Sequence, residues 1–261
     1  MNQTKAFSLT CASMALATSL LGQAIIFEDD FSVSEANGNP NTAVWRMVGE
    51  TADKTIKVTE QGWLHYRKVD ADGGLYITAE NRFSAGHTVI TLEFDFLKPS
   101  LTSWDAPNGL GPRIRFGQGN PFINANRVAN DNRFDQNGQF AGVAGVFETD
   151  EWQSMRIVYN HSTSEVTYVG SSLTVPAQTY DVWVNGVRVI AGHTYNTFAT
   201  GLAPDSPLTS IAFGGFNNET GELFMDNMVV YANAIPEPST YALIGGLAVL
   251  GAAIFWRRRR S

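Results

Sequence analysis

Apolar and polar side chains alternate along most of the chain between residues 25 and 232. The clearest example is residues 88–98, TVITLEFDFLK. In an extended chain Leu92, Phe94 and Phe96 fall on one side, and the polar residues between them fall on the other. A period of two, interrupted at short intervals by Gly, Asn, Asp and Pro, is typical of half-buried β-strands joined by turns. No amphipathic helix of ordinary length is predicted in this region.

Turn residues sharpen the pattern. Asn185-Gly186 between two alternating runs, 180–184 and 187–190, predicts a two-residue hairpin, because both turn positions need a positive φ. Glu60-Gln61-Gly62 predicts a second hairpin, and Asn137-Gly138 predicts a hairpin tip within residues 134–140. The other expected strands are residues 25–31, 42–48, 55–59, 63–69, 75–79, 112–117, 152–160, 165–169, 210–216 and 222–231. Residues 152–160 and 165–169 are expected to pair.

About a dozen short antiparallel strands in about 200 residues favour two packed sheets over a barrel or a propeller. The sequence therefore predicts an all-β domain over residues 25–232, a two-sheet antiparallel jelly-roll sandwich.

The N-terminus has the composition of a secretory signal peptide over residues 1–24. Lys5 supplies a positive start, residues 6–21 are mostly apolar, and Gly22-Gln23-Ala24 fits a small-x-small cleavage site ending at Ala24. Cys11, the single cysteine, lies inside this segment. The mature domain is therefore expected to hold no disulfide and no thiolate metal site.

The C-terminus predicts a membrane segment. A linker over residues 233–240 contains Pro236-Glu237-Pro238, and residues 241–256, YALIGGLAVLGAAIFW, carry no charge. Residues 257–261 then place Arg257, Arg258, Arg259 and Arg260 together. An apolar run closed by a basic cluster is typical of a single membrane span with its basic end in the cytoplasm, which leaves the preceding domain on the outer side.

Charge narrows the choice of partners. Lys5, the four terminal arginines and Glu237 lie outside residues 25–235, so that region keeps 13 basic and 24 acidic side chains, a net charge of −11. So acidic a domain repels nucleic acid and anionic lipid, so neither is expected to bind it.

Pro236-Glu237-Pro238, the Gly/Ala/Leu-rich span and the arginine cluster together resemble the PEP-CTERM sorting signal of Gram-negative bacteria. The resemblance implies recognition by an exosortase-type membrane protease. It also implies an inner-membrane-anchored intermediate, removal of the tail, and passage of the protein to the cell surface or extracellular matrix.

The central domain resembles the concanavalin A-like lectin and glucanase jelly roll. The resemblance is carried by Glu28-Asp29-Asp30-Phe31, by TLEFDF within residues 88–98, by VWVNGVRV within residues 180–190, and by Leu223-Phe224-Met225-Asp226-Asn227. It implies a β-sandwich over nearly the whole mature domain and a carbohydrate-related function.

Glu93 and Asp95 are the catalytic candidates, because residues two apart on a strand point to one face. Laminarinase-like members of the superfamily place a third carboxylate two or three positions further on, and two carboxylates are needed for retaining glycoside hydrolysis. Here those positions hold Leu97 and Lys98. A glycoside hydrolase using Glu93 and Asp95, with an acid from another strand, is therefore the alternative to a non-catalytic domain.

Metal and sugar sites give two further hypotheses. Asp29 or Asp30 in the first strand and Asp226 in the last are expected to meet and to hold a structural Ca²⁺; no other cofactor is expected. The carbohydrate candidates are loop or near-loop residues that stack on sugar rings or bond their hydroxyls: Trp104, Asp105, Arg113 and Arg115. The remaining indoles that bear on the fold, Trp45, Trp63, Trp152 and Trp183, are expected in the core or at sheet edges.

The sequence thus predicts an exported surface or matrix protein whose sandwich binds carbohydrate or other matrix components without catalysis. A laminarinase-like hydrolase and a purely structural surface protein remain the two alternatives.

Overall fold

The computed structural model describes residues 24–32, 38–69, 72–100, 111–128, 132–135, 138–168, 172–194, 201–216 and 219–233. In this part of the chain the strands are antiparallel, and the one helical element is the short 3₁₀ turn η1 (Asn124–Asn126). The all-β prediction is confirmed. None of these described residues forms a helix long and apolar enough to cross a membrane. Residues 1–23 of the predicted signal peptide and the predicted span 241–256 lie outside the described residues.

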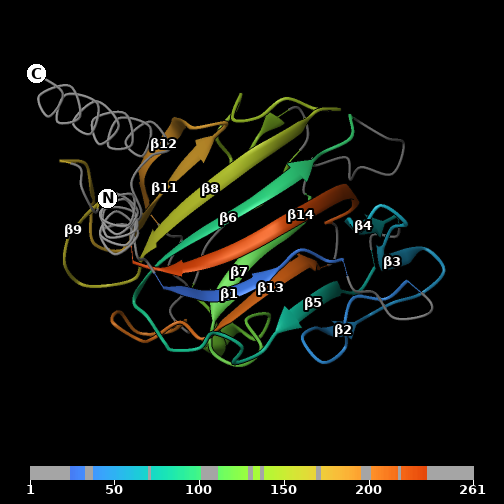
Figure 1. Ribbon diagram of the computed structural model, residues 1–261, viewed down its shortest axis with the longest axis horizontal. Coiled ribbons are helices and arrows are strands. Elements are labelled where there is room, and N and C mark those ends of the chain that lie inside the picture. The colour runs from blue at the N-terminus through green and yellow to red at the C-terminus, as the bar shows by residue number, and fades with distance from the viewer. Residues whose placement is uncertain are drawn as a thin grey trace, which may run out of the picture.

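The larger sheet has eight strands (Figure 1). Its path runs through β12 (Val187–Thr194), β11 (Thr179–Val184), β8 (Trp152–Asn160), β6 (Val89–Leu97), β14 (Gly221–Ala232), β4 (Leu64–Lys68) and β3 (Lys54–Val58). The eighth strand, β1 (Ile25–Asp29), pairs with the second half of β14, whereas β4 pairs with its first half. The 12-residue β14 therefore pairs with β6 along one edge and with both β4 and β1 along the other.

The smaller sheet has four strands, in the order β2 (Arg46–Val48), β5 (Leu75–Ala79), β13 (Ser210–Gly215) and β7 (Arg113–Gly117), and forms a second layer (Figure 1). Side chains from both sheets meet in one core. Phe116 of β7 packs on Tyr159 of β8, with ring centroids 4.8 Å apart, and Phe213 of β13 packs on Tyr66 of β4 at 5.4 Å. The two-sheet sandwich follows from these contacts.

Alternation along β6 sets the orientation of its side chains. Leu92, Phe94 and Phe96 are buried in the core, whereas Glu93 and Asp95 are partly exposed on the opposite face. The predicted two-residue hairpin is also confirmed: Asn185 and Gly186 have φ of 50° and 78° and connect β11 to β12.

One predicted pairing is wrong. β8 pairs with β6 and β11, and it does not pair with the segment that follows it. That segment forms the short strand β9 (Val166–Thr167), which pairs with an unpredicted strand, β10 (Thr174–Val175). The predicted tip around Asn137-Gly138 falls partly outside the described residues, which show an isolated bridge between Phe134 and Phe140.

Candidate functional site

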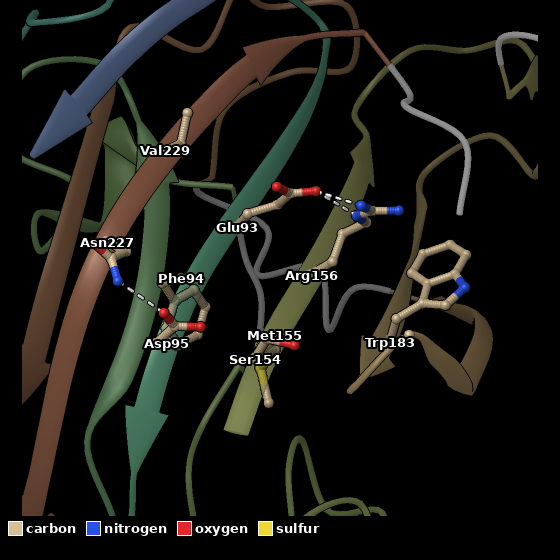
Figure 2. Close-up of a pocket in the computed structure, with 10 residues that line it drawn as sticks. Glu93, Phe94, Asp95, Ser154, Met155, Arg156, Trp183, Asn227 and Val229 are labelled. Atoms are coloured by element: carbon tan, nitrogen blue, oxygen red, sulfur yellow. Dashed lines mark hydrogen bonds and ion pairs between the residues drawn. The ribbon is translucent and has the colours of Figure 1, made fainter. Parts of the chain in front are cut away.

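Three hollows adjoin one another on the outer face of the larger sheet. The first, of about 350 Å³, lies over β6 and β8 and includes Glu93, Asp95 and Arg156 (Figure 2). The second, of about 410 Å³, shares Asp95 with the first and reaches Trp152. The third, of about 530 Å³, lies toward β1. Because neighbouring hollows share lining residues, we treat them as one groove across the sheet and call it the outer groove.

Glu93 is held by an arginine from the neighbouring strand. Arg156 lies opposite Glu93 in the β6–β8 register, and its Nε donates to Glu93 Oε1 at 2.6 Å. Its terminal nitrogen lies 2.5 Å from the same oxygen, so the two side chains form an ion pair (Figure 2). The charge of Glu93 is therefore largely balanced inside the groove.

Asp95 and Asp226 face each other from neighbouring strands. They are register partners of β6 and β14, so both carboxylates lie on the outer face of the sheet. Immediately after Asp226 the register shifts by one residue, and Asn227 has a φ of 51°. Such a β-bulge re-aims side chains, and asparagine tolerates the left-handed backbone better than most residues.

The bulge gives both carboxylates a neutral donor. The side-chain amide of Asn227 donates to Asp95 Oδ2 at 2.9 Å (Figure 2), and its backbone N–H donates to Asp226 Oδ1 at 2.8 Å. Burial raises the pKa of Asp226, and the nearby charges of Asp95 and Asp30 raise it further, against the lowering effect of the Asn227 N–H. The pair thus concentrates negative charge in the second hollow.

An aromatic wall borders the same hollow. Trp152 is 38% exposed, and its ring centroid lies 4.9 Å from that of half-buried Trp63. Phe224 of β14 packs against Trp63 and stacks on His65 at 4.3 Å. His65 in turn bonds Glu222, and this hydrogen bond is the main cause that lowers the pKa of Glu222.

The indoles divide into two groups. Trp45 and Trp183 are each 1% exposed, in keeping with the predicted core or sheet-edge positions, although Trp183 also lines the first hollow. Trp152, in contrast, is exposed on β8 inside the sheet. Hydrophobic period alone did not distinguish them, because an outward-facing Trp next to polar residues has the same alternation as an inward-facing one.

Two predicted sugar-binding arginines lie on the other side of the sandwich. Arg113 and Arg115 are on β7 of the smaller sheet, and neither lines the outer groove. Arg113 pairs with Glu219, and the Arg115 guanidinium lies 4.4 Å from the ring centre of Phe122. Trp104 and Asp105 lie outside the described residues.

The predicted calcium ligands are engaged by protein donors. Asp29 accepts from the Phe31 N–H at 2.8 Å and from the Trp45 indole at 2.5 Å, and Asp30 accepts from the Ser32 hydroxyl and N–H. Within the described residues no group of three His, Cys, Asp or Glu side chains is arranged to hold a metal ion. The structure therefore gives the calcium hypothesis for Asp29, Asp30 and Asp226 no support.

Residues 234–260 match the PEP-CTERM protein-sorting motif. The match confirms the sorting prediction and supports an exported surface protein. Pro236, Glu237, Pro238 and the arginine cluster belong to this segment, which lies outside the described residues. Ala24, at the predicted signal-peptide cleavage site, is described: its carbonyl accepts from the Ala232 N–H at 3.0 Å, directly before β1.

No curated protein matches the chain. Among solved structures it is similar to alginate lyase vAL-1 from Chlorella virus (13% identity, TM-score 0.47, 80% of this chain and 100% of that chain). It is also similar to an endo-1,3-β-glucanase from Streptomyces sioyaensis (14% identity, TM-score 0.43, 82% of this chain and 97% of that chain). A third similar structure is the carbohydrate esterase vb_24B_21 from Shiga toxin-encoding bacteriophage phi24B (12% identity, TM-score 0.44, 82% of this chain and 100% of that chain). Likeness this distant carries no argument about chemistry, and the concanavalin A-like relationship stays a prediction.

Proposed function

We propose that this protein is exported, is held in the inner membrane by its C-terminal segment until an exosortase-type protease processes it, and then acts at the cell surface or in the extracellular matrix. There its β-sandwich binds carbohydrate in the outer groove, without catalysis. The sorting motif at residues 234–260 supports the route.

The second hollow is the observation that carries the binding function. It brings Trp63 and Trp152 together with Asp95, Asp226 and Ser154. Indole faces stack on the apolar faces of sugar rings, and carboxylate and hydroxyl oxygens bond the ring hydroxyls. Ligand sites typically combine such apolar walls with a few converging polar groups.

The surroundings of Glu93 support a non-catalytic domain. A glycosidase nucleophile must reach the sugar. Glu93 Oε1 is instead held by Arg156, through a hydrogen bond from Nε and an ion pair with a terminal nitrogen. Leu97 and Lys98 stand where laminarinase-like enzymes have the third carboxylate. Lys98 is 2% exposed, and its amine donates to the Pro99 carbonyl. We therefore assign Glu93 to the wall of a binding groove.

Glycan-array binding of the full-length protein in detergent tests the proposal. Removing a central aromatic anchor costs about 2 kcal/mol or more, so Trp152→Ala should weaken binding at least about tenfold. Phe216→Ala is the matched control, because Phe216 is 37% exposed, close to the 38% of Trp152, and does not line the groove.

Two outcomes would replace this proposal. Release of reducing ends from a β-glucan, abolished by Glu93→Gln, would establish the hydrolase. Neither binding nor turnover on any glycan would leave the purely structural surface protein.

A further inference from the structure

The charges in the outer groove are strongly unequal. Six carboxylates contribute to the three hollows: Glu28, Asp29, Asp30, Glu93, Asp95 and Asp226. Among the described residues that line these hollows, Arg156 is the single Lys or Arg, and it is paired with Glu93. A concave, partly apolar surface with one sign of charge concentrates ligands of the opposite sign.

The charge is most concentrated where the aromatic wall begins. Asp95 and Asp226 are direct partners across β6 and β14, and both line the hollow that holds Trp63 and Trp152. Their observed donors are the neutral amide and N–H of Asn227, which leave both negative charges in place. Carboxylates so placed destabilise each other, and a cation between them would remove that repulsion.

The geometry points to a cation on the ligand itself. A sugar ring stacked on the Trp63–Trp152 wall would place its substituents beside Asp95 and Asp226. A ring substituent that carries positive charge in polysaccharides is the ammonium group of an amino sugar, and an ammonium has three donors for carboxylate oxygens. Uronate-containing polymers, in contrast, would bring further carboxylates against Asp95 and Asp226, and the like-charge repulsion would exclude these polymers from the groove.

Resting on the proposed function, we propose that the groove selects glycans bearing free amino groups. The sugar ring stacks on Trp152 and Trp63, the ammonium lies between Asp95 and Asp226, and polyuronates are excluded. The Glu93–Arg156 pair is neutral overall and serves the hydroxyls of the next sugar.

Calorimetric titration of the full-length protein in detergent at pH 6 and low salt tests this selectivity. Four oligosaccharide probes of equal length are compared: glucosamine, N-acetylglucosamine, β-1,3-glucose and uronate hexamers. The glucosamine hexamer should bind at least about tenfold tighter than either neutral hexamer, and the uronate hexamer should not bind. Raising the salt should weaken the glucosamine complex and leave the neutral complexes nearly unchanged.

Substitutions separate a specific site from general attraction of a polycation to an acidic protein. Asp226→Asn and Asp95→Asn should each reduce the preference for glucosamine over the neutral hexamers at least about fivefold. Asp53→Asn removes the same charge from an exposed position that does not line the groove, and should have no effect. Trp152→Ala should weaken the glucosamine and neutral complexes alike.

The outcomes distinguish the two proposals. Equal binding of neutral and glucosamine hexamers, tightest binding of the uronate, or a preference lost equally in Asp53→Asn would overturn the selectivity. Carbohydrate binding in the outer groove would survive each of these provided that Trp152→Ala still weakened it. Absence of binding to all four probes and to a wider glycan array would overturn both.

Discussion

The outer faces of the two sheets use polar side chains in opposite ways. On the larger sheet, Asp95 and Asp226 face each other in a hollow, and their donors among the described residues are the neutral amide and N–H of Asn227. On the smaller sheet, Arg113 of β7 forms a largely buried ion pair with Glu219, which precedes β14; the two side chains are 16% and 5% exposed. Arg113 has its partner within the fold, whereas the carboxylates of Asp95 and Asp226 stay available to a ligand.

Aromatic rings show the same contrast. Phe122 stacks on Tyr76 with centroids 4.1 Å apart, packs on Phe216 at 5.3 Å and covers Arg115, which is 3% exposed. In the outer groove, Trp152 packs on Trp63 and remains 38% exposed. Aromatic residues close one face and line an open hollow on the other. A candidate ligand site is therefore recognised by polar and aromatic side chains that remain accessible to solvent and are not engaged by other parts of the fold.

The closed face should be the more sensitive to substitution, and Gly214 gives the largest expected effect. It has a φ of 142°, and a Cβ there would lie 2.2 Å from the Leu75 carbonyl oxygen of β5. Backbone strain and the clash together should make Gly214→Ala cost about 3–4 kcal/mol of unfolding free energy, measured by urea denaturation.

Gly142→Ala is the control for strain alone. Gly142 also has a positive φ, 79°, but an added Cβ would meet nothing within 4 Å. Its cost should be about 1 kcal/mol. Equal losses in the two variants would show that close packing of β13 on β5 is not what stabilises the closed face.

The two ion pairs give the next largest difference. Glu219→Ala leaves Arg113 without its buried carboxylate and removes the acceptor of the Phe216 N–H, so it should cost about 3 kcal/mol. The Glu93 side chain is 29% exposed, against 5% for Glu219, so water can partly replace it beside Arg156, which is itself 10% exposed. Glu93→Ala should therefore cost less, about 1–2 kcal/mol. Urea denaturation of both variants checks the difference, and a larger loss at Glu93 would reverse the assignment of closed and open faces.

Much of the fold could be predicted because period two is a local signal. Residues 75–79 and 152–160 were expected as strands and match β5 and β8 residue for residue. The pairing of β8 could not be predicted in the same way. Its pairing with β6 and β11 depends on packing between segments that are distant in the sequence. The chain after β8 forms β9 and then lies over β11, where Tyr168 packs on Trp183 and donates to Asp181.

The candidate site was only half predictable. Glu93 and Asp95 share a face because they are two apart on one strand, which the sequence states directly. The approach of Asp226 depends on the β6–β14 register and on the bulge at Asn227, which no local pattern reports. The role of Arg156 could not be predicted for the same reason: which carboxylate of a neighbouring strand it neutralises depends on how the strands pair.

The smallest predicted effect concerns the pH dependence of the opposed carboxylates. Since the pKa of Asp226 is raised in the folded protein, the fold favours its protonated form, and the ionised form costs stability at neutral pH. Asp226→Asn should therefore raise the unfolding free energy at pH 7 by about 0.2–1 kcal/mol, the range for like charges opposed across a strand pair. The gain should shrink as the pH falls through the folded pKa and vanish below the unfolded value of about 3.9.

Asp30→Asn is the control with the opposite sign. The pKa of Asp30 is lowered by its hydrogen bond from the Ser32 hydroxyl and then by the Ser32 N–H, so its ionised form favours the fold. That contribution is present above the unfolded pKa and is lost as the pH falls through the folded one, so Asp30→Asn should destabilise at pH 7. Thermal melts of both variants from pH 7 to pH 3 check the two signs. A stability gain in both would mean that general relief of negative charge, and not the Asp95–Asp226 contact, sets the electrostatics of the outer groove.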